Sequence, residues 1–163
     1  MPSRDAPAAV DSIGSLVDHA ADLLVRHLSD RADMTASAGF VMNRLHREGP
    51  TRLTTLAARE GVSQPSMTQL IQRLERRGLV AKVADPGDGR AALIGVTDDG
   101  VALIEHREAA RRDRLAQLLE TVSDEDRDAL TLAARVALPI LQSLVAAADT
   151  LCPNTAADER GQA

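Results

Sequence analysis

Aromatic residues are almost absent from this chain. Among its 163 residues there is a single phenylalanine, Phe40, and there is neither tryptophan nor tyrosine. Aliphatic side chains and alanine must therefore form the core, and the abundance of Leu and Ala favours helices over a β-sandwich. At this length we expect one compact domain with extensions.

Cysteine is equally scarce. The single thiol, Cys152, can form neither an internal disulfide nor a cysteine metal cluster, although redox control through it is kept as an alternative. The N-terminal residues hold no apolar signal-peptide core behind Arg4, and no run of about 18 uninterrupted apolar residues occurs. We therefore expect a cytoplasmic protein.

Residue sets typical of catalysis are also missing. No Ser/His/Asp or Cys/His set, glycine-rich phosphate loop or pair of catalytic carboxylates has a recognisable spacing. The four histidines do not have the spacing of metal ligands and are more simply surface or crevice residues: His19, His27, His46, His106. A metal site assembled across helices, with Glu48 or Glu105, is the alternative. The sequence predicts no enzyme, no metal site and no cofactor.

Positive charge is concentrated in the middle of an acidic chain. The formal net charge is −5, yet residues 44–90 contain nine basic and five acidic side chains. A local excess of positive charge favours a polyanionic partner, and the acidic remainder would suppress indiscriminate binding.

A strongly amphipathic segment, residues 63–77, lies within this basic region. With 100° per residue, Leu70, Ile71 and Leu74 fall within about 60° of Met67 on a helical wheel and form an apolar face. Apart from Pro65, the opposite face consists of side chains that hydrogen-bond to bases and phosphates: Ser66, Thr68, Gln69, Gln72, Arg73, Arg76. For Arg76, as for Arg77, the alternative is interaction with the dipole of the helix end.

The segments before this helix predict a helix-turn-helix. Residues 1–9 lack periodicity and are expected to be a disordered arm, and an amphipathic helix is expected from Val10 within residues 10–33. Thr35 should cap a helix that buries Phe40 and ends at Gly49-Pro50, before a short strand. A short helix should then end at Gly61, after which Val62 enters the core and Ser63 caps the next helix.

The segments after it predict a β-hairpin and two long helices. Apolar runs at 79–83 and 93–96 flank the turn-forming sequence DPGDGR. Thr97 should cap a helix over 98–121, whose charged middle should cross open solvent with local pairs between Glu108 and Arg111 or Arg112. A final helix over 124–148 should be kinked or broken by Pro139, and residues 152–163 should be a flexible tail.

The segment 34–100 resembles the MarR family of winged helix-turn-helix transcription regulators. The most specific match is DPGDGRAALIGVTDDG, residues 85–100, which fits the family pattern of Asp-Pro, Asp-x-Arg, an apolar strand and Val-Thr-x-x-Gly. The resemblance implies a mainly α fold with a small β-wing (α+β), in which a DNA-binding region, 34–97, lies between dimerisation helices at 10–33 and 98–151.

The resemblance also implies a function and its residues. It implies a homodimer that binds a roughly palindromic operator on double-stranded DNA, often as a repressor, and is released by a small molecule, oxidation or metal. The helix beginning at Gln64 would enter the major groove, while Arg90, oriented by Asp88, would enter the minor groove, where narrow grooves concentrate negative potential. Oxidation sensors of the family carry a reactive cysteine near the N-terminus, which this sequence lacks.

The predicted DNA-binding set therefore combines the helix and the hairpin: Ser63, Gln64, Pro65, Ser66, Thr68, Gln69, Gln72, Arg73, Asp88, Arg90. For Gln69, Arg73 and Arg90 the alternative is a solvated surface, and Asp88 could be simply a turn residue. For the whole protein the alternative is a winged-helix module that contacts other proteins, which would need an apolar outward face on the helix.

Overall fold

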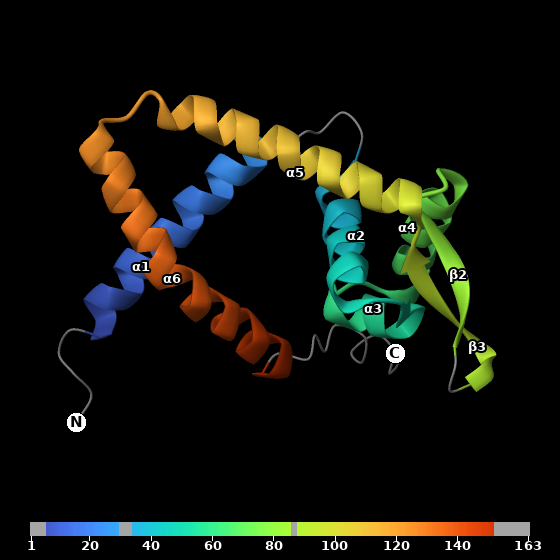
Figure 1. The fold of residues 1–163 in the computed structure, drawn as a ribbon. Helices are drawn as coiled ribbons and strands as arrows, with labels where there is room; N and C mark the ends of the chain where they lie inside the picture. Colours follow the sequence, from blue (N-terminus) through green and yellow to red (C-terminus); the bar gives the residue numbers. More distant parts are fainter. Residues whose placement is uncertain (1–5, 30–33, 86–87, 152–163) are drawn as a thin grey trace.

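A computed structural model describes residues 6–29, 34–85 and 88–151, and for residues 6, 88–91 and 149–151 it describes the backbone alone. The expected fold class is confirmed: helices predominate, and one small antiparallel sheet accompanies them (Figure 1). The elements follow in the order α1 Ala6–Leu23, η1 Leu24–Leu28, α2 Ala36–Glu48, β1 Thr51–Arg52, α3 Leu53–Arg59, α4 Gln64–Arg76, β2 Val80–Asp85, β3 Asp88–Val96, α5 Asp98–Leu119 and α6 Asp124–Leu151.

The sheet joins the short strand β1 to the hairpin. Its strand order is β1-β3-β2, and both pairings are antiparallel, with Thr51 opposite Ile94 and Val80 opposite Val96. The hairpin strands reach further than predicted, to Asp85 and from Asp88, because pairing continues past an irregularity at Ala84/Asp85. The connection Pro86–Gly87 lies outside the described residues.

One hydrophobic core holds the winged module together, and every predicted apolar residue of α4 belongs to it. Most of its members come from α2, α3, α4 and the sheet, with Met34 and the α5 residue Ile104 closing one side. Met42, Leu56 and Met67 have no exposed surface. At about 25 cal/mol per Å² of apolar surface, burial of such side chains is the main stabilising contribution to this module.

Two predicted core residues are instead on the surface. Phe40 is 58% exposed, because the buried face of α2 is made by Ala38, Val41 and Leu45, and Phe40 lies on the opposite side of the helix. Val62 is 39% exposed: its N–H donates to the Ala57 carbonyl at 3.1 Å, which closes the end of α3 and leaves the side chain outside.

The N-terminal helix begins earlier than predicted and ends in an unusual turn. It starts at Ala6, where alanines favour helix and Pro7 is tolerated in the first turn, so the expected arm is at most residues 1–5, which lie outside the described residues. Its last five residues, Leu24–Leu28, form the π-helix η1. Such turns are rare and occur frequently at functional sites.

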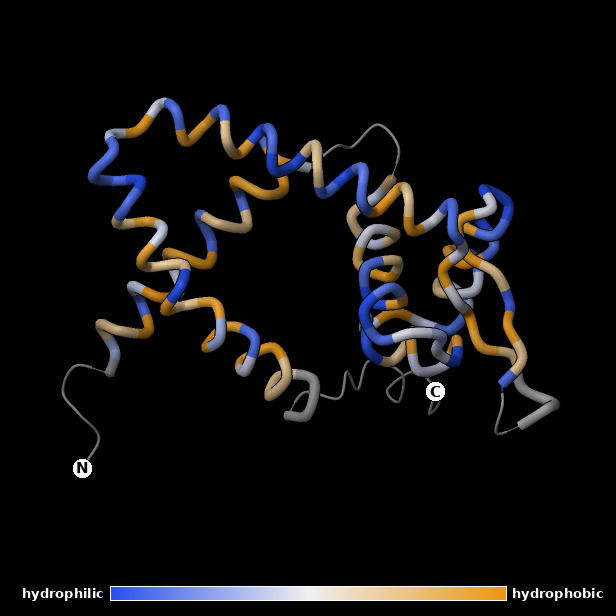
Figure 2. Tube along the Cα trace, viewed as in Figure 1, coloured by the Kyte–Doolittle hydropathy of each residue, from blue (hydrophilic) through white to orange (hydrophobic). Residues whose placement is uncertain are grey.

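The two outer helices bury almost nothing. Described side chains of α1 and α6 are largely exposed, including Val10, Ile13, Leu16 and many apolar residues of α6. Hydrophobic positions recur along both helices, at the end of the molecule remote from the wing (Figure 2). Pro139 does not break α6, which continues as one helix from Asp124 to Leu151.

By length and composition alone, α6 over Asp124–Ala148 is also apolar enough to cross a membrane. The same test is passed by helices of soluble proteins that are covered by other protein surfaces. An exposed apolar face of this size is normally covered, either by another protein surface or by a membrane.

Candidate nucleic-acid interface

The α3–α4 unit is a helix-turn-helix built by local capping. Gly61 has φ of +64°, the left-handed conformation that ends α3, and Ser63 starts α4 by accepting a hydrogen bond from the Ser66 N–H at 3.3 Å. Both caps are those predicted from the sequence. They fix the angle at which α4 leaves the turn.

The structure gives α4 one buried face and one exposed face. Met67, Leu70, Ile71 and Leu74 are buried against the core. The predicted DNA-binding side chains of this element are on the other side, where Thr68 is half-buried and the others are exposed: Ser63, Gln64, Pro65, Ser66, Gln69, Gln72, Arg73. The module is thus anchored by one face of α4 and presents a polar face to solvent.

Some of these polar groups form hydrogen bonds within α4 and its N-terminal cap. The Ser63 and Ser66 hydroxyls lie 2.9 Å apart, and the Thr68 hydroxyl donates to the Gln64 carbonyl at 2.8 Å. These interactions occupy part of the hydrogen-bonding capacity of the first turn. The longer side chains of Gln69, Gln72 and Arg73 extend from the exposed face and are better suited to reach base edges.

An ion pair near the turn end of the hairpin has no signal in the sequence. Arg52 of β1 donates from Nη2 and Nε to one carboxylate oxygen of Asp85, at 2.7 and 3.2 Å. The two residues are 33 positions apart, so only the strand order β1-β3-β2 brings them together. Asp88 and Arg90 belong to β3, but their side chains lie outside the described residues, and their expected roles stay predictions.

The Thr-x-x-Gly sequence after the hairpin joins three elements. The Thr97 hydroxyl donates to the Gly78 carbonyl at 2.6 Å and accepts from the Gly100 N–H at 3.1 Å, so one side chain caps α5 and ties it to the end of α4. Gly100 packs so closely that a Cβ there would lie 2.2 Å from the Leu79 carbonyl oxygen. The wing, α4 and α5 are therefore positioned together.

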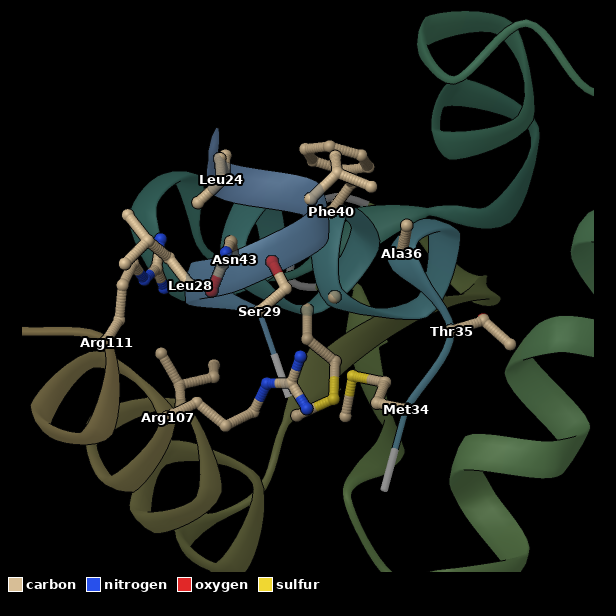
Figure 3. Close-up of a pocket in the computed structure, with 14 residues that line it drawn as sticks. Leu24, Leu28, Ser29, Met34, Thr35, Ala36, Phe40, Asn43, Arg107 and Arg111 are labelled. Atoms are coloured by element: carbon tan, nitrogen blue, oxygen red, sulfur yellow. The ribbon is translucent and has the colours of Figure 1, made fainter. Parts of the chain in front are cut away.

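Behind this unit, a pocket lies where η1, α2 and α5 meet (Figure 3). Its volume is about 440 Å³, and most of its lining surface is apolar. The helix middle that was expected to cross open solvent forms one wall, because Arg107 and Arg111 are half-buried there. In the described part of the chain, no ion pair joins Glu108 to Arg111 or Arg112, so the predicted local pairs are wrong.

Comparison with known proteins identifies the family. The family model described as "MarR family" matches residues 34–92. An HTH-type transcriptional regulator of Mycobacterium bovis is 32% identical over 117 residues, which cover 72% of this chain and 82% of that protein. The chain belongs to the MarR family. A regulator of Mycobacterium leprae matches to the same extent.

Solved structures agree with the MarR fold. The transcriptional regulator Tm0710 from Thermotoga maritima, 19% identical, superposes with a TM-score of 0.64 over 88% of this chain and 99% of that chain. RV1404 from Mycobacterium tuberculosis, 24% identical, gives 0.66 over 80% and 92%. MepR of S. aureus, solved with bound ethidium bromide and 21% identical, gives 0.52 over 83% and 95%.

Membership of the MarR family settles the class of function. The protein is a transcription regulator with a DNA-binding helix-turn-helix, and it is not an enzyme. Within the described residues, no group of three or more His, Cys, Asp or Glu side chains is arranged to hold a metal ion.

Proposed function

We propose that this MarR-family regulator is a homodimeric repressor that acts in the cytoplasm and binds a pseudo-palindromic operator. The observation that supports this most is the exposed polar face of α4, which shares one hydrophobic core with the wing. In the proposed complex α4 lies in the major groove, and Gln69, Gln72 and Arg73 contact base edges and phosphates. Arg90, with Asp88 beside it, enters the minor groove.

The exposed apolar helices support the homodimer. Apolar side chains occur all round α6, among them Leu132, Val136 and Ile140, and a helix of this kind is normally buried. The winged module is too far from most of α6 to cover it (Figure 1). A second copy with the same exposed α1 and α6 would bury both faces and relate two α4 helices by a twofold axis.

Footprinting on fragments of the native genome enriched by the protein tests the operator model. We expect two protected half-sites about one helical turn, roughly 34–36 Å, apart. A single asymmetric half-site would contradict the twofold arrangement. Salt titration adds a second readout, because neutralising about six phosphates gives a slope of roughly −5 in log K against log salt.

The pocket beside η1 supports release by a small molecule. Ligand sites in proteins are mostly apolar clefts of roughly 300–1,000 Å³ with a few polar groups, and the pocket described above has this character. The fold neighbour MepR was solved with bound ethidium, a small molecule. We propose that an effector in this pocket lowers the affinity of the dimer for its operator.

A further inference from the structure

We propose that α4 selects A·T base pairs in each operator half-site, with Gln69 and Gln72 reading adenines and Pro65 contacting a thymine methyl group. This specificity rests on the DNA complex proposed above, in which α4 lies in the major groove. Three features of the described residues carry it: the angular position of these side chains, amide groups that have no partner within the protein, and an apolar N-terminal end of the helix.

The four buried apolar residues of α4 define the middle of its exposed face. With about 100° per residue, the direction opposite their mean lies within about 30° of Pro65, Gln69 and Gln72, all of which are exposed. Arg73 lies about 70° from this direction. A helix seated in the major groove directs its central side chains at base edges and its flanking side chains at phosphates. The central residues therefore set specificity, and Arg73 sets affinity.

The three central residues also lie at the right end of the helix. In a helix-turn-helix, the N-terminal residues of the second helix contact base edges. Pro65, Gln69 and Gln72 occupy the early and middle turns of α4, whereas Arg76, on the same face, is its last residue. From Pro65 to Gln72 the helix rises about 10 Å, which matches about three base-pair steps of roughly 3.4 Å. One short, continuous segment of each half-site is thus read.

The amides of Gln69 and Gln72 are available to DNA. No hydrogen bond joins either amide to another described residue, whereas the Thr68 hydroxyl is engaged by the Gln64 carbonyl. A glutamine donates from Nε2 to adenine N7 and accepts at Oε1 from the adenine amino group. Guanine presents two acceptors, N7 and O6, so Oε1 would face a second acceptor there. Two central glutamines therefore favour adenine over guanine.

The N-terminal end of α4 is apolar at the centre of its exposed face. Pro65 has neither a backbone N–H nor a polar side chain, so it can offer DNA only an apolar contact. Val62, 39% exposed, adds a second apolar side chain just before the cap of the helix. The apolar group that the major groove presents is the C5-methyl group of thymine. A thymine opposite Pro65 is the base that fits this end of the helix.

Duplexes with single-atom changes test this reading. The full-length protein first selects its preferred sequence from random duplexes of about 30 base pairs, which hold two half-sites one turn apart. The selected duplex is then remade with 7-deazaadenine, which lacks the N7 acceptor, or with deoxyuridine, which lacks the methyl group, at one position at a time. Fluorescence anisotropy measures the affinity of each duplex.

We expect two adenines in each half-site at which 7-deazaadenine weakens binding about tenfold. We also expect one thymine at which deoxyuridine weakens binding about fourfold, the contribution of one buried methyl group. A selected duplex whose affinity changes at no such position would overturn the proposal and leave the sequence-specific regulator intact, with DNA deformability as the source of selection. Failure to enrich any sequence would overturn the operator model and this specificity together.

Alanine variants assign each contact to a side chain. Gln69 and Gln72 are exposed, so Gln69→Ala and Gln72→Ala should fold normally. Each variant should abolish the effect of 7-deazaadenine at one adenine and keep it at the other, and Pro65→Ser should abolish the effect of deoxyuridine. A less stable helix would weaken binding to all duplexes alike, so analogue effects that persist unchanged in these variants would overturn the assignment.

An exchange of base preference is the strictest test. Arginine binds O6 and N7 of guanine, so Gln69→Arg should prefer guanine over adenine at its position by about tenfold or more. Arg76→Gln is the matched control on the same face, in the last turn of α4; it should weaken binding to all duplexes to a similar extent and leave the preferred bases unchanged. A Gln69→Arg protein that still prefers adenine would overturn the role of Gln69.

Discussion

At the scale of single residues, Arg90 is the sharpest test of the DNA interface. We predict that Arg90→Ala weakens operator binding by about 1–3 kcal/mol while the dimer stays folded, because an arginine in a narrow minor groove contributes about this much. A gel-shift titration measures the change, and Arg112→Ala, on the exposed side of α5, serves as the charge-matched control. Equal affinities of wild type and Arg90→Ala would contradict the wing assignment.

Gly100 gives a prediction about stability. A methyl group there would overlap the Leu79 carbonyl and lie 2.6 Å from the Val96 side chain, so Gly100→Ala forces α5 away from the wing. We expect a loss of about 1–3 kcal/mol in the free energy of unfolding, measured by urea denaturation at fixed protomer concentration. Gly14→Ala is the control, since nothing lies within 4 Å and alanine is the better helix former by about 1 kcal/mol.

At the scale of elements, periodicity and capping were sufficient for α4, whose buried face and Ser63 cap follow from adjacent residues. The size of Phe40 predicted a core position, but its angle on α2 places it opposite the buried face formed by Ala38, Val41 and Leu45. The π-turn η1 has no sequence signal comparable to a cap. Its distinguishing feature is a tertiary contact with α5, which no local sequence pattern predicts.

The Arg52–Asp85 ion pair yields a prediction about the wing. Arg52 is half-exposed and Asp85 is largely buried, so the pair should add little to stability but tie the turn end of β2 to β1. We expect Arg52→Met to weaken operator binding several-fold while the melting temperature changes little. The double exchange Arg52→Asp/Asp85→Arg should recover part of the affinity, and a double variant no better than Asp85→Arg alone would argue against this role for the pair.

At the scale of the whole molecule, the sequence could predict a DNA-binding protein with apolar outer helices, but not the pocket between η1, α2 and α5. The basic middle of the chain indicated DNA binding, and the apolar helices at its ends indicated a dimer. The pocket could not be predicted, because its wall combines residues near 24, 40 and 107 that no local pattern connects. Arg107 belongs to a charged stretch typical of a solvated face, and only tertiary packing buries its Nη1.

The dimer itself can be tested at α6. Leu144 is 55% exposed in the single chain, so Leu144→Glu should leave the winged module folded, yet it would place a carboxylate in the proposed apolar interface. We predict that the variant sediments as a monomer and loses most of its operator affinity. A monomer contacts one half-site and lacks the gain in affinity that comes from binding two half-sites at once. Gln142→Glu adds the same charge at a polar position of the same helix and should remain dimeric. A dimeric Leu144→Glu protein would show that α6 is covered in another way, and co-sedimentation of the wild type with lipid vesicles would identify that cover as a membrane.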